Sequence, residues 1–352
     1  MDNVIFEDVK RICSENQALL QKLEASTLLI SGGGGFLGSY ILDIIDYCNN
    51  NIFTTPCKVI CVENFITGVP ERIKHLMNNQ YISIVNKDVS KPLDITDKLD
   101  YIIHCAGIAS PTFYRKYPIE TIEVNVTGLK NLLELAKINN VKSFLYFSTS
   151  EIYGNPTSDN IPTPEAYNGN VSCTGPRACY DESKRLGETL CVNYYNQYNI
   201  PIKVVRPFNV YGPGLRLDDR RVIPDYFMDA FKKKHIVIYS DGRPTRSFCY
   251  ISDAVTGFLK AFLSLHNGEA FNIGSDEKEI SMYELAEMVA ESVGDVTIEY
   301  QESQEKGYLT DNPQRRCPDL CKAKKLLDYK PAVSLKEGLY RLKEWYVKNY
   351  DI

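Results

Sequence analysis

The chain has 352 residues, a net charge of −5, 44% hydrophobic and 24% charged residues, which is the balance of a globular protein longer than one typical domain. The acidic balance argues against nucleic acid or an anionic membrane surface as a partner. No apolar run approaches the roughly 20 residues that span a bilayer, and MDNVIFEDVKRICSENQ is no signal peptide. The 11 cysteines include no CxxC pair and His is scarce, so we expect free thiols in the cytoplasm and no metal site.

The predicted elements begin with a helical extension and continue as alternating strands and helices. Residues 1–26 carry apolar residues such as Ile5, Val9 and Ile12, which predicts a helix packed on the body of the molecule or on a partner subunit. Short apolar runs then follow, typical of parallel strands buried on both faces. These runs are 27–31, 58–64, 82–88, 100–107 and 143–150.

A predicted helix lies between the last two of these strands, because residues 119–136 have apolar side chains at helical spacing. Another strand, in 202–214, runs into a Gly/Pro loop. Beyond it the pattern is less regular, with a helix near 281–293. The alternation predicts a Rossmann-type doubly wound parallel sheet, followed by a smaller mixed C-terminal lobe.

A glycine cluster, SGGGGFLGS at 31–39, follows the first predicted strand and opens a helix. Glycines at 32, 35 and 38 permit a tight turn, close approach of a pyrophosphate, and close helix–strand packing. A flexible turn is the alternative for glycines alone, but the second strand ends in VEN. Glu63 can accept hydrogen bonds from an adenosine ribose, and its charge would repel the extra phosphate of NADP. The sequence therefore predicts NAD as the cofactor.

Tyr180 and Lys184, in YDESK, are four residues apart and so share one face of a helix. A buried ammonium near a phenol lowers the pKa of the phenol, so Tyr180 could take a proton from a sugar hydroxyl as hydride leaves for NAD. An incidental pair on a surface helix is the alternative for these two residues alone. The preceding strand end, Thr149-Ser150-Glu151, favours the catalytic interpretation.

A series of motifs occurs in order: GGGGFLGS, VENFITG, HCAG, FSTSEIYG, YDESK, RPFNVYGPG and RSFCYISD. They resemble those of the extended short-chain dehydrogenase/reductase family of nucleotide-sugar epimerases, dehydratases and decarboxylases, from about residue 27 to the end. STSEIYGNP, GPRACYDESKRLGETLC and DNPQRRCPDLCKAKKLL look most like the UDP-glucuronate decarboxylases.

The resemblance implies an NAD-binding Rossmann domain at 27–205 and a mainly nucleotide-sugar-binding lobe at 206–352, with the chain crossing back to the first domain. It also implies a homodimer, because family members commonly pair two long helices per subunit into a four-helix bundle. Those helices would be the one near 119–138 and the one that bears Tyr180.

The resemblance further implies roles for single residues. Tyr180 would be the acid/base with Lys184, Thr149 would hydrogen-bond the reacting hydroxyl, Glu151 would position water or steer the sugar ring, and Arg316 would hold the sugar carboxylate. Surface ion pairing is the alternative for each arginine taken singly. The expected cofactor-binding residues are Gly32, Gly35, Phe36, Leu37, Glu63, Asn64, Asp88, Val89, Ala106, Gly107, Asn125, Ser148, Tyr180 and Lys184. The expected substrate-binding residues are Asn209, Arg221, Val222, Tyr239, Arg246 and Arg316.

Ser150 is the catalytic-site residue that discriminates between reactions. The related 4,6-dehydratases carry an Asp there that protonates a leaving hydroxyl, and serine is a far poorer acid. The sequence therefore predicts decarboxylation of UDP-glucuronate to UDP-xylose through a 4-keto sugar, with the hydride returned at the end. A 4,6-dehydratase, a 4-epimerase and a non-catalytic NAD-binding scaffold stay open as alternatives. Gly107, Ile108 and the insert at 162–174 depart from the decarboxylase pattern near the sugar.

Overall fold

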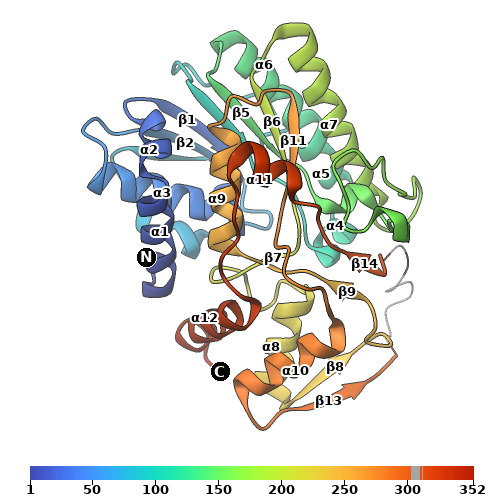
Figure 1. The fold of residues 1–352 in the computed structure, drawn as a ribbon. Helices are drawn as coiled ribbons and strands as arrows, with labels where there is room; N and C mark the ends of the chain where they lie inside the picture. Colours follow the sequence, from blue (N-terminus) through green and yellow to red (C-terminus); the bar gives the residue numbers. More distant parts are fainter. Residues whose placement is uncertain (303–309, 311) are drawn as a thin grey trace.

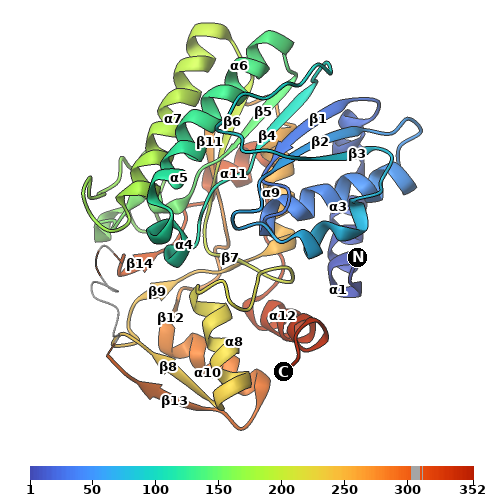
Figure 2. The same ribbon diagram turned by 180° about the vertical axis from the view of Figure 1, so that it is seen from behind.

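The computed structural model describes residues 1–302, 310 and 312–352, so Asp311, the first residue of one signature segment, lies outside it. Its centre is a seven-stranded, all-parallel sheet of order β11-β6-β5-β4-β1-β2-β3 (Figures 1 and 2). The five strands predicted before residue 150 are confirmed, as is the one that follows residue 201. The strands are β1 Thr27–Ser31, β2 Lys58–Glu63, β3 Ile82–Asn86, β4 Tyr101–His104, β5 Ser143–Phe147, β6 Ile202–Pro207 and β11 Glu269–Ile273.

Helices cover both faces of the sheet, which confirms the doubly wound arrangement (Figures 1 and 2). One face carries α3 (Phe36–Asn51) and α9 (Ile251–Phe262), and the other carries α6 (Leu129–Asn139) and α7 (Ala178–Tyr198). The helix predicted at 119–136 is α5 (Pro118–Glu123) and α6 joined by a π-helical turn at Val124–Gly128. None of the helices in the described part of the chain combines the length and apolar character that crossing a membrane requires.

The smaller lobe is mixed, as predicted, and lies beyond the carboxyl ends of the strands (Figure 1). Two of its short strands bring distant arginines together, because β14 pairs with β9 so that Arg316 lies opposite Arg246. Its helices are α8 Val222–Lys233, α10 Met282–Val293 and α12 Leu335–Asn349, whereas α11 Cys321–Leu327 packs at the main sheet, against β11 and α9 (Figure 1). Its strands are β7 Val210–Tyr211, β8 His235–Ile238, β9 Thr245–Arg246, β10 Cys249–Tyr250, β12 Ile280–Ser281, β13 Thr297–Tyr300 and β14 Arg315–Arg316. The remaining short helices are α2 Gln17–Leu20, η1 Gln21–Leu23, η2 Pro70–Leu76, α4 Pro111–Lys116, η4 Ser150–Tyr153 and η5 Ser158–Asn160.

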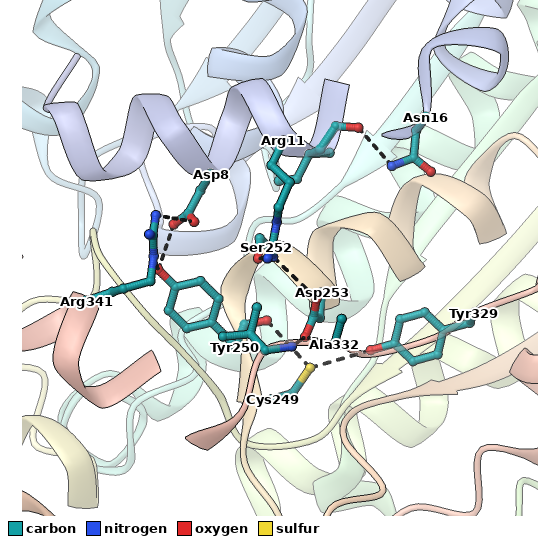
Figure 3. A network of polar contacts seen from close by, with 12 residues as sticks. Asp8, Arg11, Asn16, Cys249, Tyr250, Ser252, Asp253, Tyr329, Ala332 and Arg341 are labelled. Atoms are coloured by element: carbon teal, nitrogen blue, oxygen red, sulfur yellow. Dashed lines mark hydrogen bonds and ion pairs between the residues drawn. The ribbon is translucent and has the colours of Figure 1, made fainter. Parts of the chain in front are cut away.

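The N-terminal helix α1 (Asn3–Glu15) packs on the body of the molecule, against α3 and α9. Its Asp8 is 2% exposed and accepts hydrogen bonds from Tyr250 Oη at 2.8 Å and Arg341 Nη2 at 2.9 Å (Figure 3). One turn further on, Arg11 contacts Ser252 and Asp253 on α9. Because Tyr250 ends β10 and Arg341 lies on α12, this helix links the short β7–β10 pair to the C-terminal helix.

Candidate active site

The glycine loop after β1 depends on the absence of side chains. Gly32 has φ +81°, and a Cβ there would lie 2.5 Å from Ala106 Cα. A Cβ on Gly38 would lie 2.2 Å from the Gly32 carbonyl oxygen. The loop therefore leads into α3 without side chains at its glycine positions. Its backbone faces the adjacent hollow, which is the arrangement that binding of a pyrophosphate requires.

Two adjoining hollows meet at this loop. We call them the glycine-loop cavity, which runs from Gly32–Gly38 to Tyr180 and Lys184, and the Glu63 pocket, which runs from Gly32 to Glu63 and Asp88. Every expected cofactor residue except Asn125 lines one of them. Phe36, Leu37, Ser148, Tyr180 and Lys184 line the glycine-loop cavity, Glu63, Asn64, Asp88, Val89 and Ala106 line the Glu63 pocket, and Gly32, Gly35 and Gly107 line both.

Glu63 is buried at the end of β2, at the wall of its pocket. Its carboxylate accepts hydrogen bonds from the backbone N–H groups of Gly34, at 2.9 Å, and Phe65, at 2.8 Å. A carboxylate has about four lone-pair positions, so acceptors stay available for ribose hydroxyls. The position and charge of Glu63 fit the predicted dinucleotide.

Asn125 lies in the π-helical turn, a type of distortion that is frequent at functional sites. Its amide nitrogen donates to Ser183 Oγ at 2.9 Å, and its buried Oδ1 has no partner among the described residues. A Cβ on Gly107 would lie 3.3 Å from that oxygen and 3.2 Å from Lys184 Nζ. An orphaned acceptor beside a glycine is a feature that a bound cofactor would satisfy.

A third hollow, of about 300 Å³, adjoins the glycine-loop cavity and lies over the smaller lobe. Arg177, Arg220, Arg221, Arg246 and Arg316 line it, so we call it the arginine cavity. Glu151, Asn209 and Arg221 line both cavities. All the expected substrate-binding residues line it: Asn209, Arg221, Val222, Tyr239, Arg246 and Arg316.

Glu151 lies where the arginine cavity and the glycine-loop cavity meet, and its carboxylate is in contact with two arginines. Arg316 contacts both carboxylate oxygens through its two terminal nitrogens, and Arg177 contacts one of them. Burial would raise the pKa of Glu151, but the charges of Arg177 and Arg316 outweigh it and lower the pKa. Glu151 is therefore an ionised carboxylate that cannot donate a proton at neutral pH. The alternative of surface ion pairing does not describe Arg316, which is 8% exposed.

The comparisons with known proteins agree with this geometry. Residues 28–274 match the family described as "NAD dependent epimerase/dehydratase family". The chain belongs to the NAD-dependent epimerase/dehydratase family. The predicted family and the predicted NAD cofactor are thereby confirmed.

Individual relatives show which members of the family the chain resembles. The chain is 39% identical over 316 residues to UDP-glucuronic acid decarboxylase 1 of Arabidopsis thaliana, covering 90% of this chain and 68% of the relative. It is 36% identical to UDP-glucuronic acid decarboxylase 1 of Xenopus tropicalis, covering 94% and 75%. Among solved structures, the epimerase Mth375 of Methanothermobacter thermautotrophicus has a TM-score of 0.82 and 27% identity, covering 96% of each chain. UDP-glucuronic acid 4-epimerase of Bacillus cereus has a TM-score of 0.75 and 26% identity, covering 92% of this chain and all of the other.

Within this family fold, one expectation about Tyr180 is wrong. We expected the Lys184 ammonium to lower the pKa of Tyr180. Instead burial raises that pKa well above its usual value, and a hydrogen bond with Thr149 only partly opposes the rise. Lys184 Nζ donates to the Phe147 carbonyl oxygen at 2.7 Å and lies 5.9 Å from the centre of the Tyr180 ring. Burial also lowers the pKa of Lys184, to about 8.

Three residues at the site escaped the sequence analysis: Tyr114, Arg177 and Asp181. The Tyr114 ring stacks on that of Tyr180 at 5.3 Å, tilted by 7°, and fixes its plane. Arg177 contacts Asp181 as well as Glu151. Their spacing in GPRACYDESK, four residues along a helix, could have signalled this pair. Nothing in the sequence signals Tyr114.

Ser148 and Ser150 differ in how they face the site. Ser148 donates its hydroxyl to Glu188 Oε1 at 2.5 Å, so its side chain can meet a cofactor as a hydrogen-bond acceptor. Ser150 is 3% exposed and lines the glycine-loop cavity beside Glu151. Ser150 therefore shares this cavity with Thr149, Glu151 and Tyr180.

Proposed function

We propose that the chain decarboxylates UDP-glucuronate to UDP-xylose, with NAD recycled within each turnover. The observation that carries the proposal is the pair of guanidinium groups, Arg177 and Arg316, around Glu151 at the junction of the two cavities. Two arginines beside the catalytic tyrosine suit a sugar that carries a carboxylate. The decarboxylase names of the Arabidopsis and Xenopus relatives support the same substrate.

The chain's own residues account for the proton movements. A bound NAD would supply the hydride acceptor for carbon 4 of the sugar and, in its reduced form, the donor for the return step. Tyr180 would accept the proton of the 4-hydroxyl, with Thr149 holding the same oxygen, because the positive charge of a bound nicotinamide would oppose the effect of burial on its pKa. The resulting β-keto acid loses carbon dioxide, and the bonding electrons pass into an enolate that hydrogen bonds from Tyr180 and Thr149 stabilise. Carbon 5 would then take up a proton from a water molecule that Glu151 orients, and Tyr180 would give its proton back to the oxygen on carbon 4 as the hydride returns.

Arg316 and Glu151 would act as an exchange pair in this scheme. A substrate carboxylate can replace the Glu151 carboxylate on the two terminal nitrogens of Arg316, and the guanidinium then still faces one negative charge. Glu151 would then be free to orient the sugar or a water molecule, while Arg177 keeps it ionised. The diphosphate would bind near Arg221 and Arg246 in the arginine cavity.

A 4-epimerase is the second candidate, because the structure of UDP-glucuronic acid 4-epimerase from Bacillus cereus is similar over 92% of the chain. Mass spectrometry of the product separates the two. We expect purified protein to convert UDP-glucuronate to UDP-xylose with release of carbon dioxide. A product of unchanged mass would indicate epimerisation, and loss of water from a dTDP-hexose, with UDP-glucuronate untouched, would indicate a dehydratase.

We also propose a homodimer formed through α5 and α7. Large apolar side chains on these helices are exposed, including Ile119 at 63%, Ile122 at 40% and Leu186 at 46%. The two helices lie side by side (Figure 2), so a second copy could cover both at once. The four-helix bundle expected from the sequence would bury this surface.

We propose a cytoplasmic location because the cysteines are free thiols. All 11 are free thiols, although Cys13 and Cys48 lie with their sulfurs 3.8 Å apart. Free thiols in this number suit a reducing compartment. Fractionation of cells with an antibody to the chain tests this directly: recovery with secreted material would contradict it.

A further inference from the structure

Arg72 is a charged residue of the glycine-loop cavity to which no motif assigns a role. It lies on η2 (Pro70–Leu76), in the segment that follows Glu63, and lines the cavity beside Gly34, Gly35 and Phe36. The segment is fixed to the glycine loop, because Val69 N–H donates to the Gly34 carbonyl oxygen at 3.0 Å. Arg72 N–H in turn donates to the Val69 carbonyl oxygen at 3.0 Å.

The guanidinium of Arg72 is held on the side of α3. Its Nη2 contacts Asp43, and the group lies 5.4 Å from the centre of the Tyr40 ring. The side chain is 9% exposed. Its Nε is buried and has no hydrogen-bond partner among the described residues. A buried N–H donor without an acceptor is costly, and the cost disappears when a ligand supplies the acceptor.

Gly214 lies beside this nitrogen and adds no side chain there. It has φ +89°, and a Cβ there would lie 3.3 Å from Arg72 Nε and 3.7 Å from the Phe36 ring. Any larger residue would crowd the gap between the arginine and the start of α3. The orphaned donor, the missing side chain and the glycine loop thus surround one small space.

Among the described cations that line the cavity, Arg72 is the one with a buried nitrogen that lacks a partner. Lys184 donates to the Phe147 carbonyl oxygen, Arg221 pairs with Asp219, and Arg216 pairs with Asp218. The glycine loop itself carries no charged side chain. A dinucleotide lying across it would bring a pyrophosphate with two negative charges to the N-terminus of α3.

We propose that Arg72 binds the pyrophosphate of the dinucleotide, with its Nε–H donating to a phosphate oxygen. Asp43 and Tyr40 hold the guanidinium in place, and the glycine loop supplies the remaining donors from the backbone. The inference rests on the NAD-dependent function proposed above and adds to it a specific anion-binding side chain.

The test measures binding of NAD, ADP and adenosine to the full chain by isothermal titration calorimetry. In Arg72→Met we expect the dissociation constants for NAD and ADP to rise about ten-fold, as for loss of one charge-assisted hydrogen bond. Binding of adenosine, which has no phosphate, should stay unchanged. Unchanged binding of ADP by Arg72→Met would overturn the proposal, and so would equal weakening of ADP and adenosine.

The matched control is His75→Gln. His75 Nε2 contacts Asp43 Oδ1 at 2.8 Å, so it shares the partner of Arg72, but it does not line the cavity. Binding of all three ligands should match that of the unaltered chain. Weakening of ADP by His75→Gln to the same degree would show that Asp43 and the fold around it, and not the Arg72 donor, set the affinity.

Arg72→Met leaves the buried Asp43 with one partner fewer, which disfavours folding. A second variant keeps the proposal testable if Arg72→Met does not fold. The double variant Asp43→Asn/Arg72→Met also removes the charge of Asp43. Its dissociation constant for ADP is compared with that of Asp43→Asn alone. We expect the same ten-fold difference for ADP; no difference would overturn the proposal. Because these ligands carry no sugar nucleotide, the result is independent of the reaction. A chain that leaves UDP-glucuronate untouched but loses ADP binding on Arg72→Met would contradict only the proposed reaction.

Discussion

Arg316 binds the carboxylate of Glu151 through both terminal nitrogens, although 165 residues separate them in the sequence. The contact exists because β14 pairs with β9 in the smaller lobe, while Glu151 follows the end of β5. Arg177 reaches the same carboxylate from the start of α7. Glu151 therefore joins the end of β5, the helix that bears Tyr180 and the C-terminal lobe at one point.

Replacing Arg316 with Gln should reduce turnover of UDP-glucuronate by about 100-fold, because the bidentate partner of the sugar carboxylate is lost. Glu151 keeps Arg177, so the chain should still fold and bind NAD. The measurement is kcat and KM for carbon dioxide release, with NAD binding in parallel. Arg315→Gln is the matched control: this neighbour pairs with Glu279 and its side chain is 47% exposed, so its turnover should be nearly normal. Equal turnover in both variants would remove Arg316 from the mechanism.

The sequence predicted the fold because its signals are local. Each of the predicted strands is a short apolar run, and the glycine loop, the acid that ends β2 and the Tyr180–Lys184 spacing mark positions on neighbouring elements. The carboxyl ends of parallel strands meet at one edge of the sheet, so these residues had to converge. The expected substrate residues also converge, on the arginine cavity.

The details that escaped prediction depend on contacts between distant segments. No spacing relates Arg316 to Glu151, and the pairing of β14 with β9 becomes visible only in the structure. The pKa of Tyr180 was misjudged for a similar reason. Helical spacing places Lys184 on the same face, but the depth of burial and the direction of Nζ toward the Phe147 carbonyl are tertiary properties.

Replacing Tyr180 with Phe should lower kcat by at least about 100-fold, because the proton acceptor for the 4-hydroxyl is lost. The ring still stacks on Tyr114, so the fold and the dissociation constant for NAD should stay unchanged. Single-turnover absorbance at the wavelength of reduced nicotinamide, with UDP-glucuronate added, measures the oxidation step itself. A variant that still reduces its cofactor at the normal rate would mean that another group takes this proton.

If α5 and α7 form the dimer interface, charged residues introduced on these helices should dissociate the dimer. Ile122→Glu/Leu186→Glu places acids on two side chains that are 40% and 46% exposed, and burying them against a second copy would be costly. We expect the dimer dissociation constant, measured by analytical ultracentrifugation, to rise at least about 100-fold. Leu265→Glu, at a side chain that is 89% exposed and lies outside these helices, should leave it unchanged. An unaltered chain that sediments as a monomer would contradict the proposed interface.

Lys203 gives the stability of the chain a distinct dependence on pH. It lies on β6, is 2% exposed, and donates to Ser143 Oγ at 3.0 Å, with no carboxylate within ion-pair distance in the described part of the chain. Burial, helped by the charge of Lys22, lowers the pKa of Lys203 to about 8, from an ordinary value of 10.5. Between these two pH values the unfolded chain holds a proton that the folded chain has released, so this lysine makes stability rise with pH there.

Lys203→Met should therefore be more stable than the unaltered chain at pH 7, by about 1–3 kcal/mol, because a buried charge is replaced by an apolar stem of similar length. The advantage should shrink as the pH rises from about 8 toward 10.5, where the native lysine is already neutral when folded. Urea unfolding at intervals across this range measures the difference in free energy of unfolding. Lys330→Met, at a side chain that is 77% exposed, should show no such trend. A constant difference for Lys203→Met would mean that the lysine stays charged throughout and that its hydrogen bond to Ser143, rather than its burial, sets its protonation.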